Sequence, residues 1–220
     1  MGDTNQLLFA KDFASIVQGP ILEVGSRDYG NTQDFRGLFT GEQYLGIDMQ
    51  AGNGVDLVLD LADDFESIDK ALQGRRFKTV ICMSVLEHCR DPFKMARNIQ
   101  SLMVDDGILL VSVPFAWEIH GFPDDYWRFT PSGVRILFPG LDFETFEGAA
   151  FAGKLNQKSS LDGDFFKLKF SLKSRHLLGG FTAFLATSFK KLGLMKSIFG
   201  YRYVFPPIMI SMVGKKNSTP

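Results

Sequence analysis

The sequence predicts an α/β fold with a doubly wound, mostly parallel sheet of seven strands, and three observations support this prediction. Short apolar runs recur along the chain, and segments with helical spacing of their apolar residues separate most of them. Strands that alternate with helices in this way are typical of parallel sheets. The chain has 220 residues with 45% hydrophobic side chains, which suits one such domain with an elaboration.

The individual elements are predicted from the spacing of apolar residues and from the glycines and prolines that end helices and strands. Apolar residues keep helical spacing up to Val17, where Gly19-Pro20 stops the first helix. Uninterrupted apolar runs predict the early strands, and Gly107 and Pro114 delimit the fifth. The expected helices cover residues 5–17, 33–39, 65–72 and 92–102, with a short one from about Pro131. The expected strands cover residues 21–25, 43–48, 55–60, 78–83, 108–113, 143–151 and 208–213.

Pattern and charge divide the chain into three parts. We expect a Rossmann-like core in residues 1–153, a basic, phenylalanine-rich α/β insertion in residues 154–204, and the last core strand with the tail in residues 205–220. Residues 1–153 hold 12 Lys and Arg against 23 Asp and Glu, whereas residues 154–205 hold 10 against 2. This asymmetry predicts different partners for the core and the insertion.

The insertion has two interpretations. In the first it is a lid or a dimer face, where lysines of the alternating stretch 166–173 protect an edge strand. In the second it contacts anionic lipid at the membrane surface through residues 164–195. The uncharged stretch 177–189 has 13 residues, fewer than the about 20 that span a bilayer, so we expect no crossing. We favour the lid or homodimer face, and the acidic core argues against nucleic acid.

The cellular setting is predicted from cysteines and from the N-terminus. Cys82 and Cys89 are the only cysteines, so no disulfide framework can form. The first residues contain no basic region followed by an apolar core, so no signal peptide is expected. Both observations favour the cytoplasm, with peripheral membrane association if the insertion contacts lipid.

Two strand ends carry the residues that predict a ligand. Glycine at position 25 lets the backbone approach a ligand, and Asp48 can accept hydrogen bonds from both ribose hydroxyls. Glu23 would repel a pyrophosphate but suits a ligand with an ammonium group. The loop after Gly25 also fails the dinucleotide pattern G-x-G-x-x-G. S-adenosylmethionine meets these requirements, because it joins an adenosine to a charged amino-acid end and has no phosphate.

The sequence resembles the class I S-adenosylmethionine-dependent methyltransferases over roughly residues 15–150 and the last strand. The run from Ser84 to Pro92 is similar to the methyltransferase-11 group, in which "LEH" followed by "DP" is common. The stretch from His120 to Pro131 resembles a subgroup often found in sugar and polysaccharide biosynthesis. The resemblance implies methyl transfer from S-adenosylmethionine to a small-molecule or glycan acceptor, with oxygen as the expected atom. The other matching runs are Leu22–Gly25, Gly46–Asp48 and Leu59–Leu61.

The resemblance also assigns cofactor contacts. It places the methionine end near the first loop, the ribose near Asp48, and the adenine near the end of the third strand. The floor of the site is expected after the fourth strand. The predicted cofactor-binding residues are Glu23, Gly25, Ser26, Arg27, Asp48, Met49, Asp60, Leu61, Met83 and Ser84.

Arg27 is a departure from the family pattern, which usually has glycine at this position. Its side chain could crowd the methionine end of the cofactor, or it could bind the cofactor carboxylate as a fork. It is the feature that most favours the alternative function, a non-catalytic scaffold or binding subunit with a nucleotide fold.

Histidines are the candidate bases, because a hydroxyl acceptor must lose a proton near neutral pH. We expect His120 or His88 in this role, with Asp125 orienting the histidine. The alternatives are a helix cap for His88 and loop scaffolding for His120. The three histidines of the chain are scattered without ligand spacing, so no metal site is predicted. The predicted substrate residues, which could instead form a core plug, are Asp124, Tyr126, Trp127 and Arg128.

Overall fold

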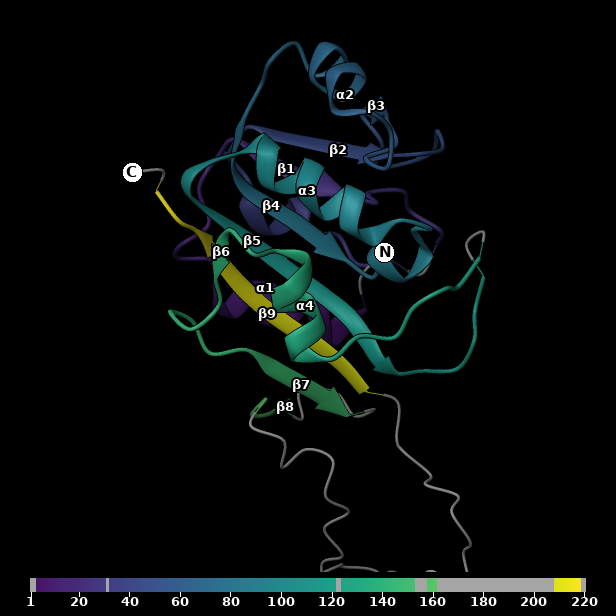
Figure 1. Cartoon of the computed structure of the whole chain (residues 1–220), viewed down its shortest axis with the longest axis vertical. Helices are drawn as coiled ribbons and strands as arrows, with labels where there is room; N and C mark the ends of the chain where they lie inside the picture. The colour runs from purple at the N-terminus through teal and green to yellow at the C-terminus, as the bar shows by residue number, and fades with distance from the viewer. Residues whose placement is uncertain (1–2, 31, 122–123, 153–157, 162–207, 219–220) are drawn as a thin grey trace, which may run out of the picture. The chain divides into compact units, whose positions relative to one another are not determined.

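The computed structural model describes residues 3–30, 32–121, 124–152, 158–161 and 208–218. Within them nine strands form one sheet in the order β3-β2-β1-β4-β5-β9-β7-β8, with β6 paired to β9 (Figure 1). The strands are β1 (Ile21–Val24), β2 (Tyr44–Asp48), β3 (Leu57–Val58), β4 (Phe77–Met83), β5 (Met103–Ala116), β6 (Leu141–Asp142), β7 (Ala149–Ala152), β8 (Lys158–Ser159) and β9 (Ile208–Lys216). The α-helices are α1 (Thr4–Asp12), α2 (Phe65–Ala71), α3 (Pro92–Leu102) and α4 (Pro131–Leu137), and two 3-10 helices are η1 (Arg36–Phe39) and η2 (Leu86–His88).

The first five strands pair in parallel, and this half of the sheet positions the site. In register, Val24 lies beside Ile47 of β2 and Cys82 of β4. The carboxyl ends of β1, β2 and β4 therefore meet at one edge of the sheet, which is where ligands bind in doubly wound folds.

The remaining strands are antiparallel to their neighbours. β9 pairs with β5 on one side and with β7 on the other. Each of the seven expected strands has a counterpart, but the third is shortened to β3 and the sixth to β7, and two short strands, β6 and β8, add to them. β5 begins at Met103 instead of after Gly107, because α3 leads directly into a strand that pairs with Phe77.

Helices cover both faces of the sheet and enclose two apolar clusters. α3 and α4 lie on one face and α1 on the other (Figure 1). Successive residues of β4 alternate between the clusters: Val80 and Cys82 pack with the α3 side, Ile81 and Met83 with the α1 side. This alternation is what a strand buried on both faces requires.

The predicted insertion falls almost entirely outside the described residues. Only its residues 158–161 are described, and there β8 pairs with β7 of the core. The lid, dimer and membrane interpretations all concern residues that the structure does not describe. Among the described residues, no helix is long and apolar enough to cross a membrane.

Candidate active site

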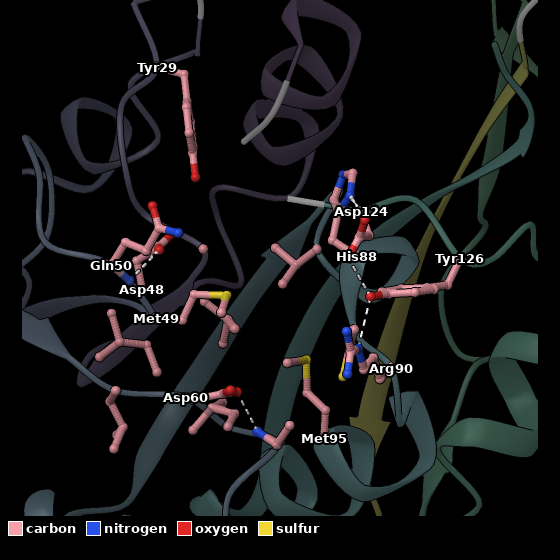
Figure 2. Close-up of a pocket in the computed structure, with 18 residues that line it drawn as sticks. Tyr29, Asp48, Met49, Gln50, Asp60, His88, Arg90, Met95, Asp124 and Tyr126 are labelled. Atoms are coloured by element: carbon pink, nitrogen blue, oxygen red, sulfur yellow. Dashed lines mark hydrogen bonds between the residues drawn. The ribbon is translucent and has the colours of Figure 1, made fainter. Parts of the chain in front are cut away.

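A cavity of about 380 Å³ opens at the carboxyl ends of β1 and β2. Figure 2 shows Asp48, Met49 and Asp60 on one side of it and His88 and Tyr126 on the other. The structure therefore brings eight of the predicted site residues to one cavity: Gly25, Asp48, Met49, Asp60, Leu61, His88, Asp124 and Tyr126. The remaining lining residues are Val24, Tyr29, Ile47, Gln50, Leu59, Ala62, Val85, Cys89, Arg90 and Met95.

Gly25 forms the turn that leaves β1 beside this cavity. Its φ of +74° lies in the left-handed region, and a Cβ there would lie 2.4 Å from a methyl group of Val85. The amides of Gly25 and Ser26 both donate to the Ile47 carbonyl, at 2.8 and 3.0 Å. Any side chain at position 25 would therefore push the loop away from Val85, which lies between β4 and η2.

The two strand-end aspartates are held by local hydrogen bonds. Asp48 accepts from the Gln50 amide at 2.9 Å, and Asp60 accepts from the Ala62 amide at 2.8 Å, each with its Oδ1. These turns fix both carboxylates at the cavity wall. A residue that sequence reasoning missed supports the second turn: the buried Asn98 amide donates to the Leu61 and Asp63 carbonyls, at 2.8 and 2.9 Å.

Arg27 braces the first loop and does not line the cavity. Its guanidinium donates to Oε1 of Gln50 and lies 4.9 Å from the ring centroid of Tyr29. Gln50 and Tyr29 themselves line the cavity. The arginine that replaces the usual glycine therefore supports the cavity wall and leaves the cavity open.

Glu23 lies away from the aspartates. It lines a second cavity of about 260 Å³, together with Ser26 and Arg36, and accepts a hydrogen bond from the Tyr44 hydroxyl at 2.9 Å. Burial raises the pKa of Glu23 above its usual range. The structure thus does not bring Glu23 and Ser26 to the cavity of Asp48, and their predicted cofactor contacts stay predictions.

Met83 ends β4 and Ser84 follows it; neither residue lines the cavity, so their predicted cofactor contacts stay predictions. Ser84 has a left-handed backbone, with φ of +55°, and such strain is common where a strand meets a functional site. Its hydroxyl accepts from the Gln6 side-chain amide of α1 at 2.8 Å. The same amide nitrogen donates to the Ser112 hydroxyl at 2.8 Å, so α1 is linked to the ends of β4 and β5.

The opposite side of the cavity is built by two segments that are far apart in sequence. Nδ1 of His88 lies 2.7 Å from the Asp124 carbonyl oxygen, and the Tyr126 amide donates to the Glu87 carbonyl at 2.8 Å. The Trp127 indole donates to the Cys89 carbonyl at 2.8 Å. These bonds fasten the loop after β5 to the segment around η2.

Asp125 organises the loop that carries His120. Its carboxylate forms a bidentate ion pair with Arg128, which lowers the pKa of Asp125 to about 2. Asp125 also accepts from the His120 amide at 3.0 Å. Arg128 additionally donates to the carbonyls of Trp117 and Glu118. Asp125 and Arg128, predicted in catalytic and substrate roles, are thus engaged with each other and with the loop backbone.

Tyr126 and Asp124 form the rim of the cavity. The Tyr126 hydroxyl donates to Asp124 Oδ2 at 2.7 Å and accepts from Arg90 at 2.9 Å (Figure 2). Trp127 lies outside the cavity lining, and its side chain is partly exposed, as is that of Tyr126.

Two histidines and one glutamate, His88, His120 and Glu87, lie close together in the segments that build the opposite side of the cavity. The rings of His88 and His120 are perpendicular, with centroids 4.9 Å apart. One ligand atom from each of Glu87, His88 and His120 lies within 4.8 Å of the others. Burial lowers the pKa of His88 and raises the pKa of Glu87 to about 8. Sequence reasoning assigned Glu87 no role, although it stands in the "LEH" run.

Comparison with known protein families gives one match over much of the chain. A family model described as "Methyltransferase domain" (Methyltransf_23) matches residues 4–145. This range contains every predicted site residue. No curated protein matches the sequence.

Solved structures share the fold at low identity. An N1-methyltransferase for 1,6-didemethyltoxoflavin from Burkholderia thailandensis is 11% identical (TM-score 0.55), covering 98% of this chain and 80% of that one. A SAM-dependent methyltransferase from Archaeoglobus fulgidus is 14% identical (TM-score 0.54, 96% and 92%). An O-methyltransferase from a polyketide multienzyme of Brevibacillus brevis is also 14% identical (TM-score 0.52, 96% and 71%). The first and third were solved with S-adenosylhomocysteine.

These findings confirm the predicted family, fold and cofactor, whereas the methyltransferase-11 subgroup stays a prediction. The neighbours include N- and O-methyltransferases, so the fold does not select the acceptor atom. Because the family model covers more than half of the sequence, the chain belongs to the methyltransferase-domain family and is an S-adenosylmethionine-dependent methyltransferase of class I.

Proposed function

We propose that the enzyme methylates a hydroxyl group of a small molecule, and that this acceptor carries a sugar ring. When bound, S-adenosylmethionine supplies an electrophilic methyl group on a sulfonium that leaves readily. The observation that carries the proposal is that His88 lines the same cavity as Asp48 and Asp60. A proton acceptor and the expected ribose and adenine contacts therefore share one space of suitable size.

The cavity wall near β1 and β2 would hold the cofactor. The backbone at Gly25 allows close approach, and Asp48 would accept from the ribose hydroxyls. Met49 has an exposed side chain at this wall and would cover the adenine, beside Asp60 and Leu61. Tyr29 and Gln50 are further candidates, because both line the cavity and are held by Arg27.

His88 is the better placed of the two candidate bases. Its Nδ1 faces a carbonyl oxygen and therefore carries the proton, which leaves the Nε2 lone pair as the proton acceptor. Nε2 is buried, so the acceptor hydroxyl would have to reach it from the cavity that His88 lines. The lowered pKa keeps the imidazole neutral near pH 7, as a base requires. His120 does not line the cavity, and its ring packs against His88, so its proposed role is to position that ring.

The acceptor class is proposed from the rim. Exposed faces of Tyr126 and Trp127 could stack on a sugar ring, while Asp124 and Arg90 would bind its hydroxyls. A lipid-linked saccharide would also explain the basic insertion noted in the sequence. Glycan biosynthesis is therefore the setting we propose.

The non-catalytic alternative loses its main support. Its strongest feature was Arg27, and Arg27 lies outside the cavity lining while it braces Gln50 and Tyr29. No other described feature favours a scaffold over an enzyme.

The test combines binding with turnover. Calorimetry should give micromolar binding of S-adenosylmethionine and S-adenosylhomocysteine and none of NAD. A panel of matched hydroxyl and amine acceptors, including free and lipid-linked sugars, is then assayed for S-adenosylhomocysteine production. Turnover with hydroxyl sugars supports the proposal, and turnover with amines alone contradicts it. His88→Asn should slow turnover about 100-fold at unchanged cofactor affinity.

A further inference from the structure

The cluster of Glu87, His88 and His120 has the composition of a metal site. Glu87 and His88 belong to η2 after β4, and His120 belongs to the loop after β5. One donor atom from each side chain lies within 4.8 Å of the other two. Two imidazoles and one carboxylate form a recurrent ligand set for zinc and related ions.

Both imidazoles are oriented as metal-bound histidines are. Nδ1 of His88 lies 2.7 Å from the Asp124 carbonyl oxygen. Nδ1 of His120 lies 3.1 Å from the Glu118 carbonyl oxygen and 3.2 Å from Asp125 Oδ2. Each Nδ1 therefore carries a proton, and each Nε2 presents a lone pair. A ring nitrogen that donates to a carbonyl or carboxylate is the usual support of a histidine ligand.

Two atoms of the cluster are buried without a hydrogen-bond partner among the described residues. They are Oε2 of Glu87, whose side chain is 1% exposed, and Nε2 of His88. Burying such atoms unpaired costs roughly 1–3 kcal/mol each, and more for a charged group. These two atoms do not hydrogen-bond to each other, whether Glu87 is protonated, as its raised pKa favours, or ionised. A cation between them satisfies both at once.

We propose that Glu87, His88 and His120 bind one divalent transition-metal ion of the zinc class. Imidazole ligands select such ions over Mg²⁺ and Ca²⁺, which prefer oxygen ligands. Nitrogen and oxygen bind zinc at about 2.0–2.2 Å, so ligands of a tetrahedral ion lie roughly 3.4 Å apart. Side-chain rotations that move each ligand atom by about an ångström would bring the three atoms to this spacing around the ion.

The open fourth position would take the oxygen of the methyl acceptor, and this part rests on the proposed function. His88 lines the cavity, so the ion would border the same space (Figure 2). A coordinated hydroxyl is more acidic, and its proton would pass to water. In the metal-bound enzyme His88 and His120 are then ligands, and the ion takes over the role of the base.

In the test, the full chain is purified in the presence of a chelator. It is then titrated with Zn²⁺, followed by calorimetry, and with Co²⁺, followed by visible absorption. One equivalent of each should bind, with the cobalt spectrum of a nitrogen-ligated four- or five-coordinate ion. Glu87→Gln and His120→Asn should each weaken Zn²⁺ binding at least 100-fold. Glu118→Gln is the matched control and should bind as the wild type does, because only the Glu118 carbonyl contacts the cluster.

Cofactor binding separates the outcomes. Each variant is also titrated with S-adenosylhomocysteine, and unchanged affinity shows that the variant is folded. Wild-type protein that binds S-adenosylhomocysteine but no Zn²⁺ overturns the metal site and leaves the proposed function standing. Zn²⁺ binding that survives both ligand substitutions equally overturns it as well. Zn²⁺ binding with turnover of amines alone would keep the site and reject the hydroxyl acceptor.

Discussion

The two sides of the cavity are built in different ways. On the cofactor side, Asp48 and Asp60 are each held by the amide two residues further along the chain. On the acceptor side, the bonds that fasten the loop after β5 to η2 join residues more than 30 positions apart, such as His88 with Asp124 and Trp127 with Cys89. Substitutions of the cofactor-side carboxylates should therefore change affinity more than stability. Substitutions on the acceptor side should change stability and turnover together.

Gly25 should break this division, because it is the cofactor-side residue that lies against Val85, in the segment between β4 and η2. We expect Gly25→Ala to weaken S-adenosylhomocysteine binding more than 100-fold and to destabilise the fold by about 2 kcal/mol, since its Cβ meets Val85. Gly74→Ala is the control, with φ of +72° and open space around the position. Calorimetry and thermal unfolding measure both. Equal losses in the two variants would show that backbone strain, and not the contact, decides.

Asp125→Asn should give the largest stability loss on the acceptor side. The Asp125 side chain is buried and forms a bidentate pair with Arg128, so its neutralisation should cost about 2 kcal/mol. The pKa of Asp125 in the folded state is about 2, below its unfolded value. This contribution is therefore present above about pH 4 and is lost as the pH falls toward 2. Chemical denaturation of wild type and variant at pH 7 and pH 3 should show the difference shrinking at acid pH.

Asp48→Ala should show the opposite behaviour. We expect about tenfold weaker S-adenosylhomocysteine binding and a stability loss of at most about 1 kcal/mol, because the lost carboxylate contacts one local amide. Asp63→Ala is an exposed control outside the cavity lining and should bind as the wild type does. Equal affinity of Asp48→Ala and wild type would refute our placement of the ribose.

Trp127→Phe should have the smallest effect. It removes one hydrogen bond, from the indole to the Cys89 carbonyl, and should cost about 1 kcal/mol of stability. Cofactor affinity should not change. The same substitution at Trp117 serves as a comparison in the same loop. A larger loss of cofactor affinity than of stability at Trp127 would contradict the separation of the two sides.

The same difference explains what could be predicted from sequence. Gly25, Asp48 and Asp60 stand directly after apolar runs, so a local pattern sufficed to place them at one sheet edge. The helix over residues 92–102 was predicted correctly because its apolar spacing and flanking residues are local signals. The two-residue strands β6 and β8 carry no such signal.

The acceptor side could not be assembled in this way. The contact between His88 and His120 could not be predicted, because the two residues are far apart in sequence and meet only when the loop after β5 folds back. Glu87 was overlooked for the same reason. Glu23 was expected at the methionine end of the cofactor, and this contact stays a prediction; in the structure its side chain accepts from the Tyr44 hydroxyl and lines the second cavity.

Arg27 has a consequence for the thermodynamics of ligand binding. A glycine at this position would leave the first loop many conformations, which a ligand would have to restrict on arrival. With its guanidinium fixed between Gln50 and Tyr29, the loop is already ordered when the protein folds. Cofactor capture by this enzyme should therefore carry a small entropic penalty for ordering this loop.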